Sequence, residues 1–357
     1  MRMKILYISS ENRKTDYLCD AVLHGLKSLL GDEVVDVGRA WFLYRNDCLA
    51  RREELSSFHG RGFSLYGLLP EDVGTDRSDI NAKIRSRFFD LIVYGSIARC
   101  HDYWELVRRH YPAEKIVFLD GEDWGDILPG FFRKGRYYKR ELQSKNPLIF
   151  PVSFSIPQEK IRPLRKDKEG DFSPLVPKGL CHKHNIKFLD ETEYYDHYSA
   201  YRYALTWRKG GWDCLRHYEI LAAGCVPYFV DLANCPSRTL FMFPKELCLK
   251  TMSLPGVCGW MPRAGYDQPV SVNHGAFDAA QYEEHLYALQ RHLHNHLTTE
   301  RVAAKLIESI ALKKRTYHHF VGVAYDMKYR ARYRYAQILP YMRKLTKRLS
   351  RLKLKLR

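Results

Sequence analysis

Residues 207–229 read WRKGGWDCLRHYEILAAGCVPYF, and this stretch decides the predicted fold. The aromatic-rich residues 203–207 predict a buried strand, which the following glycine pair would end. Asp213 is a residue type that caps helices, and the apolar side chains after it predict a helix. Gly224 predicts a left-handed helix end before a second strand. The stretch is therefore predicted to fold as strand, glycine loop, helix and strand.

A glycine loop that leads into a helix can bind an anion, because free backbone N–H groups and the helix dipole point at the same spot. Arg208, Lys209 and Arg216 add positive charge around this loop. The combination favours a diphosphate ligand. The alternative is a plain packing unit without a ligand, but such a unit does not need Glu219 between apolar neighbours.

The run RHYEILAAGCVP, residues 216–227, resembles the donor-nucleotide motif of glycosyltransferases with the GT-B fold, above all exostosin-like enzymes and bacterial surface-polysaccharide transferases. The resemblance implies two Rossmann-like α/β domains that face each other across a cleft. It also implies that Glu219 binds the ribose of a nucleotide sugar, and that Arg216, Lys209 and the Gly210-Gly211 turn hold the diphosphate. Many retaining members carry a second glutamate eight positions before the ribose glutamate, where this chain has Gly211. The stereochemical outcome of transfer therefore stays open.

The composition limits the class of protein. The chain has 357 residues, 45% of them hydrophobic, and a formal net charge of +17. This length predicts two domains, and the charge predicts an anionic substrate, a polyanion or an anionic membrane surface as partner. Nine cysteines without a CxxC pair indicate reduced thiols, and no apolar run reaches the ~20 residues that span a bilayer. We therefore expect a cytoplasmic protein without a targeting segment.

Strands and helices alternate over the first ~150 residues, which predicts a doubly wound sheet. The expected strands lie at 3–8, 34–37, 91–94 and 116–119. GxGxxG and GxxxxGK fingerprints are missing, which disfavours an NAD or ATP enzyme. We predict an N-terminal acceptor domain at 1–155, a linker at 156–179, a donor-nucleotide domain at 180–320 and a basic helical tail at 321–357. Two helices, expected at 278–296 and 299–317, would pack on the sheet of the donor domain.

An acidic turn follows the strand expected at 116–119 and contains Asp120, Glu122 and Asp123. Ligands of open α/β sheets bind at the carboxyl ends of the strands, so these side chains are candidates for a general base or for binding an acceptor hydroxyl. A second reading is a site for Mg²⁺ or Mn²⁺, because Asp-x-Glu is loosely similar to the Asp-x-Asp of metal-dependent transferases. A third is an acidic turn that pairs with nearby Arg133, Arg136 and Lys139. The sequence leaves all three readings open.

Other polar side chains follow the predicted strands and would face the same cleft. Glu11 follows the first strand, and Arg99 and His101 follow the third. Catalytic candidates are thus Asp120, Glu122 and His101, while Glu11, Arg99 and Asp123 are candidates for the acceptor side. The alternatives are a solvated turn for Glu11 and a hydrogen bond at a helix start for His101.

Two groups of histidines do not predict a metal site. Cys181, His182 and His184 lack the spacing of a zinc motif. The rings of His292, His294 and His296 are two residues apart on a predicted helix, so we expect them to diverge. We expect neither a metal nor a cofactor.

Residues 313–357 carry fifteen lysines and arginines and one aspartate. Their leucines recur at intervals that a helix could gather on one face, which favours contact with an anionic membrane surface. Nucleic acid is disfavoured, because no RNA-binding signature, helix-turn-helix or zinc finger accompanies the basic residues. In the alternative reading, the first part of this tail packs back on the N-terminal domain.

These observations predict a glycosyltransferase that moves a sugar from a nucleotide-sugar donor to a glycan or lipid-linked acceptor hydroxyl, in the synthesis of a bacterial surface polysaccharide or glycoconjugate. Such an enzyme would be cytoplasmic and peripheral at the inner face of the membrane. Two alternatives stay open, because a fold does not determine chemistry. One is a sugar-nucleotide epimerase, and the other is a non-catalytic basic protein that binds membranes or nucleic acid.

Overall fold

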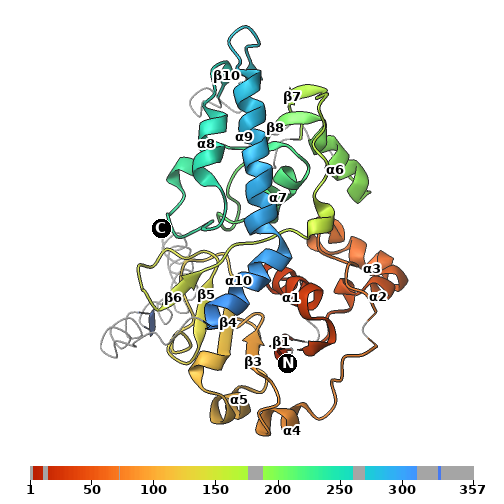
Figure 1. The fold of residues 1–357 in the computed structure, drawn as a ribbon, viewed down its shortest axis with the longest axis vertical. Coiled ribbons are helices and arrows are strands. Elements are labelled where there is room, and N and C mark those ends of the chain that lie inside the picture. Colours follow the sequence, from red (N-terminus) through yellow and green to blue (C-terminus); the bar gives the residue numbers. More distant parts are fainter. Residues whose placement is uncertain are drawn as a thin grey trace, which may run out of the picture.

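The computed structural model describes residues 3–10, 15–71, 73–175, 188–259, 270–311 and 329–330. Two parallel sheets, one below the other in the view of Figure 1, organise these residues. Six strands form the larger sheet in the order β2-β1-β3-β4-β5-β6. They are β1 (Ile5–Ile8), β2 (Val34–Val37), β3 (Leu91–Tyr94), β4 (Ile116–Asp120), β5 (Arg136–Lys139) and β6 (Ile149–Pro151).

The larger sheet is covered on both faces, as the continuous apolar runs of its strands predict. Every residue of β1, β3 and β4 is buried. Alternate side chains of β1 enter different cores: Ile5 and Tyr7 belong to one cluster, and Leu6 and Ile8 to another. The predicted α/β class is therefore confirmed, and the parallel sheet is compatible with a Rossmann-like fold.

Helices flank the strands of the larger sheet. They are α1 (Tyr17–Leu30), α2 (Arg45–Ala50), α3 (Arg52–Ser56), α4 (Ile80–Arg85) and α5 (Trp104–His110). The side chain of Asp16 caps α1 by accepting a hydrogen bond from the N–H of Cys19 at 3.2 Å, and Gly31 ends the helix with a φ of 57°. Short 3₁₀ turns connect these elements: η1 (Gly31–Glu33), η2 (Trp41–Leu43), η3 (His59–Gly62) and η4 (Ala113–Lys115).

The smaller sheet has three parallel strands in the order β7-β8-β9, with α6 between β7 and β8 and α7 between β8 and β9. The elements are β7 (Gly170–Phe172), α6 (Glu191–Ser199), β8 (Tyr201–Thr206), α7 (Leu215–Ala222) and β9 (Val226–Phe229). β7 lies inside the segment that we predicted to be a linker. The remaining elements are η5 (Gln158–Lys160), η6 (Leu232–Asn234), α8 (Lys245–Met252), β10 (Val257–Cys258), β11 (Ser271–Val272), α9 (Ala279–His292), the π-helical η7 (Leu293–Leu297) and α10 (Thr299–Ala311).

The two sheets share one continuous core. Along the described residues, the chain passes between them after β6 and again at the start of α10. Ile156 and Thr298 form a parallel bridge, in which the N–H of Thr299 donates to the carbonyl of Ile156 at 3.0 Å. Figure 1 shows α9 running through the upper part and α10 continuing into the lower part beside α1. The prediction that both helices pack on the second sheet is thus wrong for α10.

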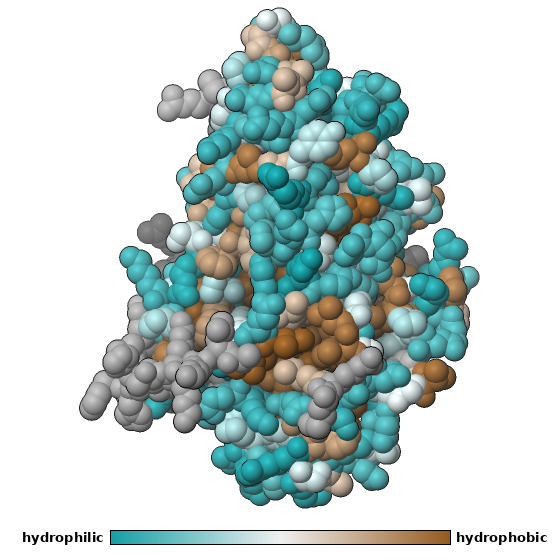
Figure 2. Space-filling model, viewed as in Figure 1, coloured by the Kyte–Doolittle hydropathy of each residue, from teal (hydrophilic) through white to brown (hydrophobic). Residues whose placement is uncertain are grey.

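Hydrophobic residues gather where α1 and α10 meet, on a face that is otherwise mostly hydrophilic (Figure 2). A second contact with the lower part comes from the C-terminal region. Tyr329 is buried, and its hydroxyl lies 2.5 Å from Ser144 Oγ while its ring packs on Phe132. The rest of the basic tail lies outside the described residues, and so does its predicted contact with membranes. Within the described ranges, no helix combines the length and apolarity that crossing a bilayer requires.

Candidate functional site

The stretch from β8 through α7 to β9 adopts the predicted order of strand, loop, helix and strand. Gly224 ends the helix with a φ of 72°, as predicted. One detail is wrong: Cys214, not Asp213, occupies the N-cap position of α7, and no side chain caps the helix. Asp213 is instead buried, and its carboxylate accepts hydrogen bonds from the N–H of Phe154 and the hydroxyl of Tyr218, both at 2.9 Å. Asp213, the predicted cap, therefore binds the backbone after β6 and not the N-terminus of α7.

His217 holds the loop against the end of β8. Its Nε2 lies 3.0 Å from the carbonyl of Trp212, and its Nδ1 lies 3.0 Å from Thr206 Oγ1. A carbonyl only accepts, so Nε2 carries the proton and Nδ1 accepts from the threonine hydroxyl. Burial lowers the pKa of this imidazole to about 3, so it is neutral at physiological pH. His217 thus stabilises the loop through these two hydrogen bonds.

Arg216 lies in the first turn of α7 and is only partly exposed. Its Nη1 atom is buried and makes no hydrogen bond within the part of the chain that the structure describes. The same holds for Nε1 of Trp207, at the other end of the loop. A buried donor without an acceptor costs on the order of 1–3 kcal/mol. Both donors are therefore candidates to bind a ligand.

Lys209 adds a second cation at this place. Although Lys209 is exposed, partial desolvation lowers the pKa of its ammonium group, and the nearby charge of Arg216 lowers it further. Two cations that repel each other in this way favour an anion between them. The structure therefore brings together the two basic residues that the sequence predicts as diphosphate ligands.

Glu219 is buried and projects from the middle of α7. Its Oε1 accepts a hydrogen bond from the hydroxyl of Ser64 at 2.6 Å, and its Oε2 accepts one from the hydroxyl of Tyr194 at 2.7 Å. Burial raises the pKa of the Glu219 carboxyl, and these two hydrogen bonds oppose the shift. The carboxylate that we predicted to bind a ribose thus holds one hydroxyl on each oxygen.

The sequence did not single out Ser64, Tyr194 or Tyr17 as site residues. Ser64 lies in a region whose mixed composition gave no prediction, and Tyr194 was visible only as part of a tyrosine-rich helix. Burial raises the pKa of the Tyr17 hydroxyl, and the charge of Glu219 raises it further. Long-range packing brings these residues together, so no local pattern could have identified them.

The glycine pair faces the acidic turn after β4. A Cβ atom at Gly210 would clash with Asp123 Oδ2, and one at Gly211 would clash with Glu141 Oε1. Glu141 also accepts a hydrogen bond from the N–H of Asp213 at 2.8 Å. Glycine is therefore required at position 211 by the close approach of the buried Glu141, whereas the Asp123 side chain beside Gly210 is exposed and can move.

Asp120 and Glu122 are both engaged in ion pairs. Asp120 accepts from Lys139 Nζ at 2.7 Å and from the hydroxyl of Tyr137 at 2.5 Å, in a fully buried network. Glu122 accepts from Arg99 Nε at 2.5 Å. Of the three readings of this turn, pairing with nearby cations is the arrangement that the geometry displays, and it includes the Lys139 that the sequence suggested.

His101 lies on the surface beside Phe131, with the two rings stacked at 5.2 Å. Its Nε2 lies 2.7 Å from the carbonyl of Ile97. Because a carbonyl only accepts, Nε2 carries the proton, and Nδ1 has a lone pair that can accept a proton. Glu11, the remaining candidate for the acceptor side, lies outside the described residues.

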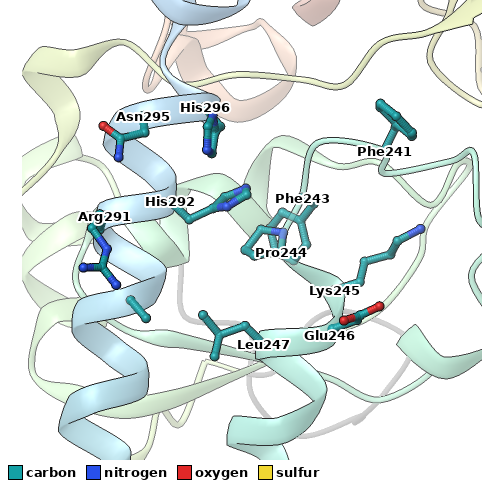
Figure 3. Close-up of a pocket in the computed structure, with 11 residues that line it drawn as sticks. Phe241, Phe243, Pro244, Lys245, Glu246, Leu247, Arg291, His292, Asn295 and His296 are labelled. Carbon is teal, nitrogen blue, oxygen red and sulfur yellow. The ribbon is translucent and has the colours of Figure 1, made fainter.

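Histidines also line a pocket of about 550 Å³ between the start of α8 and the end of α9 (Figure 3). The rings of His292 and His296 are 4.6 Å apart, so the prediction that these side chains diverge is wrong for this pair. The two residues are four apart in sequence, which places them on one helix face. Among the described residues, no group of three or more histidine, cysteine, aspartate or glutamate side chains could hold a metal ion. Cys181, His182 and His184 lie outside them.

No protein-family model matches the chain, and no curated protein sequence is significantly similar to it. The family resemblance of residues 216–227 therefore stays a prediction.

Proposed function

We propose that this protein is a GT-B-like glycosyltransferase whose two Rossmann-like domains face each other across a cleft. In this proposal it moves a sugar from a nucleotide-sugar donor to an acceptor hydroxyl. The observation that carries the proposal is the buried Nη1 of Arg216, a cationic donor without an acceptor among the described residues, beside Lys209. It lies after the carboxyl end of β8 and in the first turn of α7, where α/β folds bind phosphates.

The chemistry of transfer explains why cations are needed at this place. When the bond between the sugar and the diphosphate breaks, its electron pair leaves with the diphosphate, and the acceptor oxygen forms the new bond. Arg216 and Lys209 would stabilise the negative charge that develops on the leaving group. Glu219 would accept hydrogen bonds from the hydroxyls of the ribose.

The acceptor hydroxyl loses its proton as it attacks, so the larger sheet must supply a base. We propose His101, Asp120 and Glu122 as candidates. The ring of His101 is exposed, and its Nδ1 has no hydrogen-bond partner in the described part of the chain. These features favour His101, because cations already pair with the two carboxylates. The acceptor would be a glycan or a lipid-linked saccharide, which the basic tail would approach at an anionic membrane surface.

The test is release of free nucleotide from a panel of sugars linked to UDP, GDP or CMP, with and without saccharide acceptors, in excess EDTA. We expect release from one donor, dependent on an acceptor and insensitive to EDTA. Glu219→Ala should reduce it at least tenfold, since one charge-assisted hydrogen bond contributes about 1.5–3 kcal/mol. Glu284→Ala, at an exposed position of α9, is the matched control.

Three outcomes would contradict this proposal. If no donor releases nucleotide with any acceptor, the protein is not this transferase. Conversion of one sugar nucleotide into another without release would identify an epimerase. If EDTA abolishes activity and Mn²⁺ restores it, Asp120 and Glu122 would instead be ligands of a metal ion.

A further inference from the structure

The segment of residues 60–64, here named the latch, has a strained backbone. Gly60, Arg61, Gly62 and Ser64 have φ values of 73°, 56°, 80° and 74°. Two of these residues are not glycines, and a left-handed conformation costs each of them on the order of 1–3 kcal/mol. Such a conformation persists only where surrounding contacts hold it in place.

The contacts that hold the latch come from helices of the smaller sheet. The N–H of Ser64 donates to Glu191 Oε1 at 2.8 Å, and its hydroxyl donates to Glu219 Oε1 at 2.6 Å. The hydroxyl of Tyr195 lies 2.8 Å from Ser64 Oγ. Because Ser64 gives its only hydroxyl proton to the carboxylate, Tyr195 is the donor in this pair. Ser64 is fully buried as a result.

The two hydroxyls that donate to the Glu219 carboxylate are arranged as the two hydroxyls of a vicinal diol would be, one on each oxygen. Ser64 supplies a hydroxyl to one oxygen of the carboxylate, and Tyr194 supplies a hydroxyl to the other. The ring of Phe63 packs on that of Tyr194 at 5.7 Å, so both hydroxyls belong to one packed unit. Glu219 is only 8% exposed. A ribose diol that binds both oxygens must therefore displace Ser64 of the latch and the hydroxyl of Tyr194 on α6.

We infer that residues 60–64 form a latch which occupies the ribose-binding carboxylate in the empty protein and leaves it when a nucleotide binds. This inference rests on the proposed function of Glu219. Exchange of the Ser64 hydroxyl for a ribose hydroxyl conserves the hydrogen bond to Oε1. Release of Ser64 from its left-handed conformation offsets part of the lost packing. The ligand class is a ribonucleotide with free 2′ and 3′ hydroxyls.

The test compares the binding of nucleoside diphosphates to the full-length protein and to Ser64→Ala by calorimetric titration. The variant lacks the competing hydroxyl, so we expect its Kd for the preferred ribonucleotide to fall about 10- to 150-fold, because a hydrogen bond to a charged group contributes about 1.5–3 kcal/mol. The Kd for the corresponding 2′,3′-dideoxynucleotide should change less, since this ligand cannot replace Ser64 on Glu219. Ser57→Ala, at an exposed serine nearby, should leave both values unchanged.

Ser64→Gly is the second variant, because glycine tolerates the positive φ without strain. It should tighten ribonucleotide binding in the same way if Ser64→Ala does not fold. Unchanged or weaker ribonucleotide binding in the folded variant would overturn the latch and leave the proposed function intact. Absence of nucleotide binding to the wild-type protein would overturn both.

Discussion

Arg140 is the residue on which the two parts of the molecule converge. Its side chain is 1% exposed, and it donates to Glu141 Oε1 at 2.9 Å and to the carbonyl of Gly121 at 3.0 Å. It also contacts the carboxylate of Asp123 and the carbonyl of Asp213. One buried guanidinium thus links the acidic turn, the end of β5 and the loop before α7.

Asp213 next to this guanidinium makes the junction sensitive to pH. Burial raises the pKa of its carboxyl from 3.8 to about 7, and Arg140 opposes this shift only in part. Between these two pH values the folded protein binds more protons at this site than the unfolded chain. The contribution of Asp213 to stability is therefore largest below about pH 4, falls as pH rises, and is lost above about pH 7.

Replacing Asp213 with asparagine should remove this dependence, because the amide does not titrate. We expect the melting temperature of Asp213→Asn, relative to that of wild type, to rise between pH 5 and pH 8. Differential scanning calorimetry at both values measures it, with Asp167→Asn as an exposed control. Parallel profiles for Asp213→Asn and the wild-type protein would show that the carboxyl titrates normally.

Single residues were predictable from the sequence only where a local pattern carried them. Arg216 and Glu219 occur in one helical run, and the structure places both on α7. Arg140, by contrast, looked like one of several basic residues in an aromatic segment, and only the fold surrounds it with carboxylates. Asp213 was predicted as a cap because of its residue type, but its oxygens accept from Phe154, which is distant in sequence, and from Tyr218 on the helix itself.

At the scale of elements, α1 and α10 form the closest helix contact between distant parts of the chain. A Cβ atom at Gly25 of α1 would clash with the carbonyl of Thr299, at the start of α10. Glycine inside a helix costs about 1 kcal/mol relative to alanine. The close approach of the two backbones explains why this position holds glycine and not alanine.

Gly25→Ala should destabilise the protein although alanine favours helices. The added methyl group must push the backbone of α10 away, and overpacking of this kind costs about 1–3 kcal/mol, more than the gain in helix propensity. Chemical denaturation measures the loss. Gly275→Ala serves as the control, because its added Cβ would meet only the side chain of Asn273, at 3.4 Å. Equal or higher stability of Gly25→Ala would show that α10 can shift without cost.

Elements were predictable where burial on both faces leaves a continuous apolar run, as in β1, β3 and β4. β5 was missed, because its sequence RYYK is basic and aromatic. Lys139 is nevertheless fully buried there, and its ion pair with Asp120 compensates the charge. The local sequence of such a strand does not predict it, because its burial depends on an ion pair with the neighbouring strand.

At the scale of the whole molecule, the connection between the two sheets could not be predicted. The sequence suggested two domains with a linker, but the described part of that linker contributes β7 to the smaller sheet, and α10 returns to the larger one. The latch, the acidic turn and α7 therefore meet at one junction. We propose that the donor nucleotide binds there.

The most direct measurement is calorimetric titration of UDP, GDP and CMP into the wild-type protein, Arg216→Gln and Arg108→Gln. We expect that one nucleotide binds the wild-type protein and that Arg216→Gln weakens its binding about 10- to 150-fold, the effect of losing a charged hydrogen bond of about 1.5–3 kcal/mol. Its melting temperature should not fall, because Nη1 has no acceptor among the described residues. Arg108→Gln removes the same charge from the exposed face of α5 and should bind like wild type. Equal affinity of Arg216→Gln and Arg108→Gln, or no binding by the wild-type protein, would contradict a donor site at α7.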